Sequence, residues 1–165
     1  MTDGLRFLLD EQLGKLARWL RIIGQDAAYQ REIPDAQLLE RAAAEGRVIL
    51  TRDHRLSARA RALSFADRVT IVVLTENYPA LQLREVFQMY RERIQVAVFS
   101  RCPVCNAATA PEDKNRVEAE VPPFVFTTQT EFTRCPECRR VYWQATHRSR
   151  VALALKDILG LTIEE

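Results

Sequence analysis

The sequence lacks any apolar stretch that approaches the roughly 18 consecutive residues of a membrane-spanning helix. Its first residues also lack the basic region, apolar run and small-residue cleavage site of a secretory signal. No segment has low complexity, and nothing repeats apart from two paired-cysteine motifs. These absences argue against membrane-bound and secreted classes. We therefore expect a cytoplasmic protein without a membrane partner, and no pattern identifies a protein partner.

Lysine is scarce. Only Lys15, Lys114 and Lys156 occur among the 24 basic residues, and the other 21 are arginine. The formal net charge is only +2, so charge alone gives no argument for nucleic acid. Arginine suits planar, bidentate contact with phosphate groups. The base composition of the genome is an alternative explanation for the same bias.

Cysteine is absent from the first 101 residues, and all four cysteines follow. Five of the seven prolines also lie beyond residue 96. This change in composition predicts two units, an α/β domain over 1–95 and a small module over 96–165 that ends in a closing helix.

Short apolar runs alternate with helical periodicity through the first 95 residues. The apolar fraction of 47% is sufficient for a packed core. We expect strands at 5–9, 26–29, 48–50 and 69–74, and helices at 11–23, from 35 to about 45, at 81–94 and at 151–159. Strands separated by helices of this length predict a three-layer α/β/α parallel sheet, whose ligands bind at the carboxyl ends of the strands.

The cysteines form two CxxC knuckles, Cys102-Pro-Val-Cys105 and Cys135-Pro-Glu-Cys138, separated by 29 residues. Four thiolates complete a closed tetrahedral zinc site, so we expect a structural Zn²⁺ ion in a zinc ribbon. The segment between the knuckles, with Val121, Phe124, Val125 and Phe126, is expected to supply the strands of that ribbon. A redox dithiol pair is the alternative explanation for the knuckles.

Basic and aromatic residues surround the knuckles. Single-stranded RNA is bound through base stacking on aromatic rings and through contacts to phosphate. Alternatively, the aromatic rings only cover the small core of the ribbon. The candidate RNA-binding residues here are Arg101, Arg139, Tyr142, Trp143 and His147.

Three aspartates fall where such a sheet would gather them. Asp10 and Asp53 follow expected strands, and Asp35 begins an expected helix. Converging carboxylates repel one another unless they bind a cation, and oxygen ligands favour magnesium or manganese. Each aspartate could instead cap the N-terminus of a helix.

Basic residues follow the same edge at helical spacing. Lys15 and Arg18 are three residues apart, and Arg52 and Arg55 precede Arg59 on a second stripe. Two basic stripes beside an acidic metal site would suit a phosphodiester chain. Solvated helix faces are the alternative explanation.

Several segments resemble a known family. The segment from Phe7 to Gly24 (FLLDEQLGKLARWLRIIG) is similar to the start of the Mut-seven C-terminal RNase family. The segment from Asp35 to Asp53, ending in Thr-Arg-Asp, resembles the matching part of PIN-domain nucleases. The two knuckles, with Val-Tyr-Trp143 after the second, resemble the zinc ribbon of the Mut-seven C-terminal RNase family.

The resemblance implies a PIN-like domain fused to a zinc ribbon, and cleavage of RNA with a divalent metal. Asp10 then matches the first PIN acid, Asp35 the helix acid and Asp53 the Thr-x-Asp acid. A PIN domain usually has a further glutamate on an intervening helix, and the nearest acids, Glu11 and Glu40, lie in no matching motif.

Three hypotheses follow. The first is a metal-dependent ribonuclease, a hydrolase of phosphodiester bonds. The second is a non-catalytic RNA-binding protein of RNA, tRNA or ribosome metabolism, which the absent fourth acid favours. The third is a zinc-stabilised interaction module in which the aspartates are only helix caps.

Overall fold

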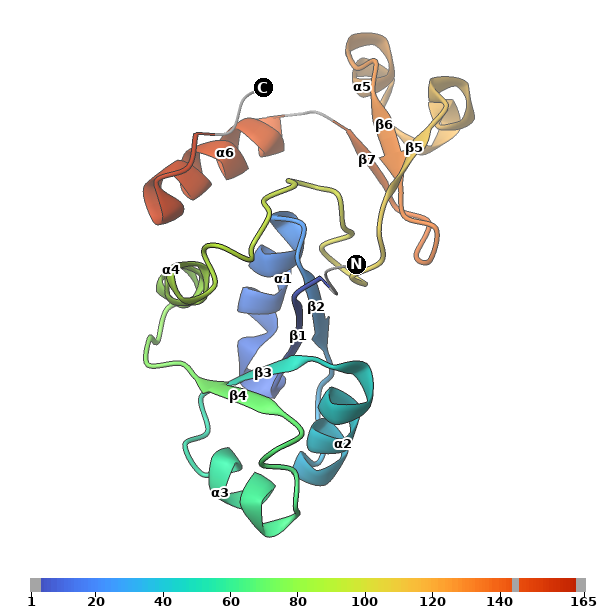
Figure 1. The fold of residues 1–165 in the computed structure, drawn as a ribbon. Helices are drawn as coiled ribbons and strands as arrows, with labels where there is room; N and C mark the ends of the chain where they lie inside the picture. Colours follow the sequence, from blue (N-terminus) through green and yellow to red (C-terminus); the bar gives the residue numbers. More distant parts are fainter. Residues whose placement is uncertain (1–3, 144–145, 163–165) are drawn as a thin grey trace.

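A parallel sheet of four strands forms the centre of the computed structural model, which describes residues 4–143 and 146–162, with the backbone alone over 146–148. The strands are β1 (Arg6–Leu9), β2 (Asp26–Tyr29), β3 (Val48–Thr51) and β4 (Thr70–Val73), in the order β2-β1-β3-β4 (Figure 1). Central β1 pairs with β2 on one side and with β3 on the other. The predicted α/β class with a parallel sheet is confirmed.

Each face of the sheet has its own apolar core. Phe7 and Leu9 of β1 point to one face, and Leu8 points to the other; all three are fully buried. A strand buried on both faces is apolar without alternation, which explains the Phe-Leu-Leu run. The first core lies against α1 (Gly14–Ile22), α4 (Pro79–Met89) and α6 (Thr146–Leu159). The second lies against α2 (Asp35–Glu45) and α3 (Leu56–Ala62).

The helix expected at 11–23 begins as a single 3₁₀ turn, η1 (Glu11–Leu13), before α1. At the other end of α1, Gly24 has φ 90°. A Cβ atom there would lie 2.6 Å from the carbonyl oxygen of Ala97. Glycine therefore lets the segment after α4 pass directly against the end of α1, where the Phe99 amide donates to the Ile22 carbonyl at 2.9 Å.

The cysteine-containing segment forms a second sheet of three antiparallel strands, β5 (Ala110–Glu112), β6 (Phe132–Arg134) and β7 (Val141–Trp143). We call this sheet and the two knuckles the ribbon. The segment between the knuckles supplies β5 and β6, as predicted, but Val121 and residues 124–126 lie outside these strands. After the 3₁₀ turns η2 (Lys114–Arg116) and η3 (Glu118–Glu120), residues 121 and 122 lead into α5 (Pro123–Thr128), which contains residues 124–126. Pro123 has no amide hydrogen for a sheet and is well suited to the first turn of a helix.

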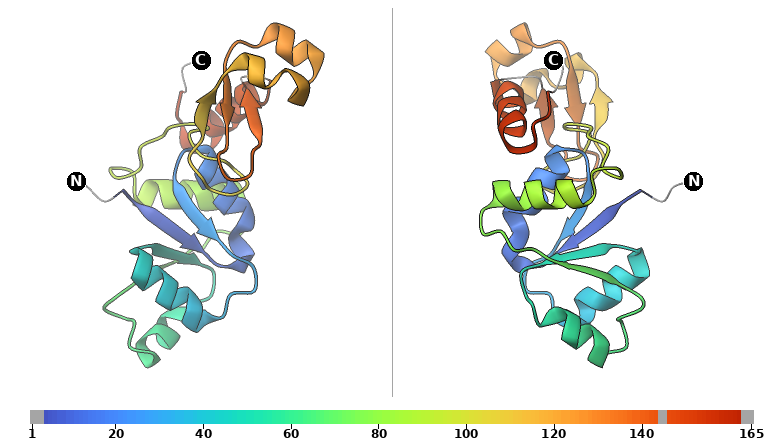
Figure 2. Two further views of the ribbon diagram at one scale, coloured as in Figure 1. Left: turned by 90° about the vertical axis from the view of Figure 1, so that its right-hand side faces the viewer. Right: turned by 60° about the vertical axis from the view of Figure 1, so that its left-hand side comes forward.

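The last helix returns to the first half of the chain. Leu155 of α6 is fully buried in the core that contains α1 and α4, and the Arg84 Nε atom donates to the Ile158 carbonyl at 2.7 Å. Figure 2 shows α6 beside α4, on the same side of the molecule. The division into 1–95 and 96–165 stays a prediction, and this packing joins α6 to the first unit. Within the described residues, no helix has both the length and the apolar character needed to cross a membrane.

Candidate metal centre and candidate active site

The four cysteines lie together. Their Sγ atoms are all within 4.8 Å of one another. The Cys102 and Cys138 sulfurs are 3.6 Å apart, and those of Cys105 and Cys135 are 3.3 Å apart. A disulfide would need about 2.05 Å, whereas four thiolates on a tetrahedral zinc ion with bonds near 2.3 Å are about 3.8 Å apart. The donor set and its spacing fit a metal ion, so the predicted cysteine cluster is confirmed.

Both knuckles have the same backbone geometry. The Asn106 amide donates to the Cys102 carbonyl at 3.0 Å, and the Arg139 amide donates to the Cys135 carbonyl at 3.1 Å. Asn106 and Arg139, each directly after a second cysteine, have φ angles of 74° and 63°. This left-handed residue closes each turn and directs both thiols of a knuckle to the same point.

Hydrogen bonds lower the pKa of one of the four thiols, that of Cys138. The backbone amide and side chain of Arg140 lower the pKa of Cys138 to about 6. Burial raises the pKa of Cys105 to about 12. The hydroxyl of Tyr142 lies 2.9 Å from the Cys102 sulfur. Because a metal binds thiolates, a cation at the centre would oppose the effect of burial on Cys105.

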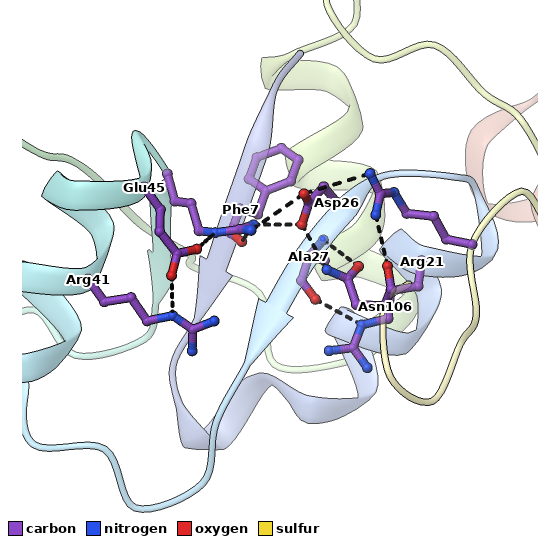
Figure 3. Close-up of polar contacts among 9 residues, drawn as sticks. Phe7, Arg21, Asp26, Ala27, Arg41, Glu45 and Asn106 are labelled. Atoms are coloured by element: carbon purple, nitrogen blue, oxygen red, sulfur yellow. Dashed lines mark hydrogen bonds and ion pairs between the residues drawn. The ribbon is translucent and has the colours of Figure 1, made fainter. Parts of the chain in front are cut away.

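The first knuckle is attached to the edge of the parallel sheet (Figure 3). Arg21 is buried, and its guanidinium donates to the carbonyls of Ala27 in β2 and Val104 in the knuckle, both at 2.8 Å. Asn106 accepts from the Ala27 amide at 3.0 Å and donates to Asp26 at 2.8 Å. Arg21 follows Arg18 by three residues on the same helix, but its contacts are structural.

Asp26 is the acid at the centre of this attachment. It accepts from Arg47 at 2.6 Å and forms an ion pair with Arg101 at 3.7 Å. Burial opposes its ionisation, but the hydrogen bonds from Arg47 and Asn106 outweigh burial and lower its pKa. Arg101 also donates to the Asn106 carbonyl at 2.8 Å, so this candidate RNA-binding residue is held against the protein. Sequence patterns did not single out Asp26.

Asp10 and Asp53 are linked through Thr51 at the carboxyl ends of β1 and β3. The Thr51 hydroxyl donates to Asp10 Oδ2 at 2.5 Å and accepts from the Asp53 amide at 2.9 Å. Thr51 is itself buried, so its position is fixed by the sheet. The Arg52 amide also donates to Asp10, at 3.3 Å. Thr51 was not among the predicted site residues.

Arg59 of α3 joins the other two acids. Its guanidinium forms ion pairs with Asp35 at the start of α2 and with Asp53. The Arg55 amide and then Arg59 lower the pKa of Asp53. These contacts connect five residues along one edge of the sheet, in the order Asp10, Thr51, Asp53, Arg59 and Asp35. We call this row of residues the acidic edge. Among the described residues, only the four cysteines form a group of three or more candidate metal ligands within 4.8 Å of one another. The three carboxylates therefore do not all lie within that distance, and they are connected through Thr51 and Arg59.

Two of the three aspartates also cap helical turns. Asp10 accepts from the Gln12 amide at 3.1 Å at the start of η1, and Asp53 accepts from the Arg55 amide at 2.8 Å before α3. Asp35 is the first residue of α2, and its carboxylate faces Arg59. These hydrogen bonds account in part for the positions of Asp10 and Asp53, whereas the contact of Asp35 is its ion pair with Arg59.

The remaining candidate RNA-binding residues lie in three places. Lys15 and Arg18 are exposed on α1, and Arg55 and Arg139 are exposed beside the acidic edge and the second knuckle. Arg52 is half-buried and contacts Asn77. The ring of Trp143 lies 6.5 Å from that of Phe132 in the ribbon core. The side chain of His147 lies outside the described part of the chain.

The sequence matches the model of one known family. The model of the Mut7-C RNAse domain matches residues 5–155, from β1 into α6. The chain belongs to the Mut7-C RNAse domain family. The match includes both the acidic edge and the cysteine cluster, so the Mut7-C RNAse domain spans both sheets. Its description indicates an RNase-like role with RNA as substrate. No curated protein and no solved structure matches the chain.

Proposed function

We propose that this protein is a metal-dependent ribonuclease with a PIN-like site, in which Asp10, Asp35 and Asp53 form the reactive centre. The observation that carries the proposal is the chain of contacts that gathers these three acids at the carboxyl edge of the parallel sheet. Ligands of parallel α/β sheets bind at this edge. Membership of an RNase family supplies the substrate class.

The acidic edge fits a hard divalent cation by its donor chemistry. It offers carboxylate oxygens, which magnesium and manganese prefer. The guanidinium of Arg59 already provides positive charge between Asp35 and Asp53. Asp10, Asp35 and Asp53 would hold the ion, which would activate water and offset negative charge at the phosphate.

The other residues of the edge orient and bind. Thr51 fixes the carboxylate of Asp10 and the turn before Asp53. Arg59 holds Asp35 and Asp53 close through its two ion pairs and lowers the pKa of Asp53, and a metal ion competes with it for the same oxygens. Lys15, Arg18, Arg52 and Arg55 bind the phosphates of the RNA chain.

We also propose that the cysteine cluster holds Zn²⁺ with a structural role. Four thiolates leave no open coordination position for a substrate. The ribbon adds affinity for RNA through Arg139, Tyr142 and Trp143. A reducing cytoplasm would keep the thiols available for the metal.

Cleavage of labelled single-stranded RNA by the zinc-loaded protein, with and without added manganese, tests the proposal. We expect manganese-dependent cleavage that Asp10→Asn and Asp53→Asn reduce at least a hundredfold. Asp67→Asn, at an exposed acid outside the edge, should cleave like wild type. RNA left intact by the wild type, or equal cleavage by the paired Asp10 and Asp53 variant, would refute the proposal.

A non-catalytic RNA-binding protein remains the second candidate. The observation that favours it is that Arg59 neutralises two of the three acids, while Asp10 and Asp53 also serve as caps. This function predicts RNA binding that weakens with salt and no turnover with any divalent ion.

A further inference from the structure

A cavity of about 530 Å³ lies between α1 and the antiparallel sheet of the ribbon. Its walls come from α1, from the segment 98–103, from β6 and β7 and from the start of α6. Four aromatic residues line it: Trp19 of α1, Phe99 of the segment after α4, and Tyr142 and Trp143 of β7. A space of this size accepts a ligand as large as a nucleotide.

The aromatic walls are held in place by contacts elsewhere. The Tyr142 hydroxyl lies 2.9 Å from the Cys102 sulfur, and Trp143 packs on Phe132 in the ribbon core. Phe99 has φ 61°, and its amide donates to the end of α1. Fixed rings lose little freedom when a flat ligand stacks on them, so the cavity is already arranged for stacking.

The charges around the cavity are mixed but mainly basic. Exposed Arg18 of α1 and exposed Arg150 of α6 line it, together with one acid, Glu131. Aromatic faces bind any base by stacking, and guanidinium groups bind the adjoining phosphates. Rings and arginines in one cavity are therefore complementary to an unstacked nucleotide rather than to a purely apolar ligand.

The cavity and the acidic edge lie at different points along the same helix. From Asp10 the chain runs through η1 and the first turns of α1 to Arg18, a rise of about 12 Å. Stacked nucleotides are spaced about 3.4 Å apart along one strand. Exposed Lys15 lies between the two sites, so about three or four nucleotides would cover the distance along a basic surface.

We infer that this cavity binds one unstacked nucleobase of a single-stranded RNA, placing the bond to be cut about three or four nucleotides away at the acidic edge. The inference rests on the proposed function for its substrate. It assigns the ribbon and α1 a joint role as a base-binding site that positions the RNA.

Intrinsic fluorescence provides a direct test, because Trp19 and Trp143 are the only two tryptophans of the chain and both line the cavity. The zinc-loaded protein, without magnesium or manganese, is titrated with hexauridylate and with a hexamer of abasic ribose phosphates. Both probes carry the same phosphates, but only the first carries bases. We expect saturable quenching by hexauridylate, and affinity for the abasic hexamer at least about fivefold weaker.

Two variants locate the binding. Arg18→Ala and Phe99→Leu should each weaken hexauridylate binding about fivefold or more, whereas Arg91→Ala, an exposed arginine outside the cavity, should not. Arg18 is exposed, so its variant should fold even if Phe99→Leu does not. Three results would each overturn the inference: equal affinity for both hexamers, unchanged hexauridylate binding by Arg18→Ala, or binding of the apolar dye ANS in the cavity without any RNA binding.

The outcomes also separate this inference from the proposed nuclease. Manganese-dependent cleavage without fluorescence quenching would refute the base-binding cavity and leave the nuclease standing. Base-dependent quenching without cleavage under any divalent ion would refute the nuclease and leave the cavity standing.

Discussion

The hydroxyl of Thr51 donates to the carboxylate of Asp10 at 2.5 Å, joining the ends of two neighbouring strands. The same oxygen accepts from the Asp53 amide at 2.9 Å. One buried side chain thereby positions two acids that lie 43 residues apart in the sequence.

Thr51→Val keeps the size and branching of the side chain and removes only the hydroxyl. We expect manganese-dependent cleavage of RNA to fall about 10- to 100-fold, the usual effect of losing a residue that orients a metal ligand. Thr70→Val, at an exposed position of β4, is the matched control. Wild-type kcat/KM in Thr51→Val would show that Asp10 needs no such support.

Arg59→Gln removes the cation between Asp35 and Asp53. Because the guanidinium and a metal ion compete for the same oxygens, we expect tighter binding of manganese in isothermal titration calorimetry. Arg61→Gln, at an exposed position of the same helix, should bind manganese like wild type. Weaker binding in Arg59→Gln would mean that Arg59 supports the metal site instead of competing with it.

Zinc should be present at one ion per chain and should stabilise the ribbon. Cys135→Ser removes a buried ligand, so zinc content measured by mass spectrometry should fall well below one and the melting temperature should drop. The thiols of the wild type should become titratable only after chelation. A zinc-free wild type whose thermal stability depends on reductant would instead indicate disulfides.

Asn106→Gly isolates the side-chain contacts of the first knuckle, because glycine accepts the φ angle of 74° found there. The loss of the hydrogen bonds to Asp26 and the Ala27 amide should lower the free energy of unfolding by about 1–3 kcal/mol. Arg139→Gly at the equivalent position of the second knuckle is the control. It relieves a positive φ angle at an exposed residue and should cost nothing.

Asp26 should make stability depend on acid. Its pKa is lower in the folded protein than the ordinary value near 3.9, so its carboxylate stabilises the fold above that pH. This contribution disappears as the pH falls through the lower pKa of the folded state. Asp26→Asn should therefore be less stable than wild type by about 2 kcal/mol at neutral pH, and the difference should begin to shrink as the pH falls below about 4. A difference that does not shrink at all in acid would contradict this assignment.

The sequence predicts the features that depend on local pattern. The apolar runs predict all four strands of the parallel sheet, and the CxxC spacing predicts the cysteine cluster. The segment between the knuckles supplies strands as predicted, but its apolar residues at 124–126 lie in a helix. Apolar residues suit a strand, whereas the two prolines before Phe124 favour a helix. The proline pair was the available signal.

Contacts between distant segments could not be predicted in the same way. Arg18, Arg21 and Arg59 are alike in the sequence, yet Arg18 is exposed, Arg21 is buried against a knuckle and Arg59 bridges two acids. Which arginine meets which carbonyl or carboxylate is decided by the packing of α1 and α3. No spacing rule distinguishes them.

The return of α6 to the core places the ribbon between two segments that pack in the same core. The chain leaves that core after Val98 and re-enters it with Val151 and Leu155, so the ribbon is tethered at two points. An unfolded loop with anchored ends has fewer conformations than a free tail, which lowers the entropic cost of refolding around the metal. Loss of zinc should therefore open a closed loop and leave α6 seated on α4.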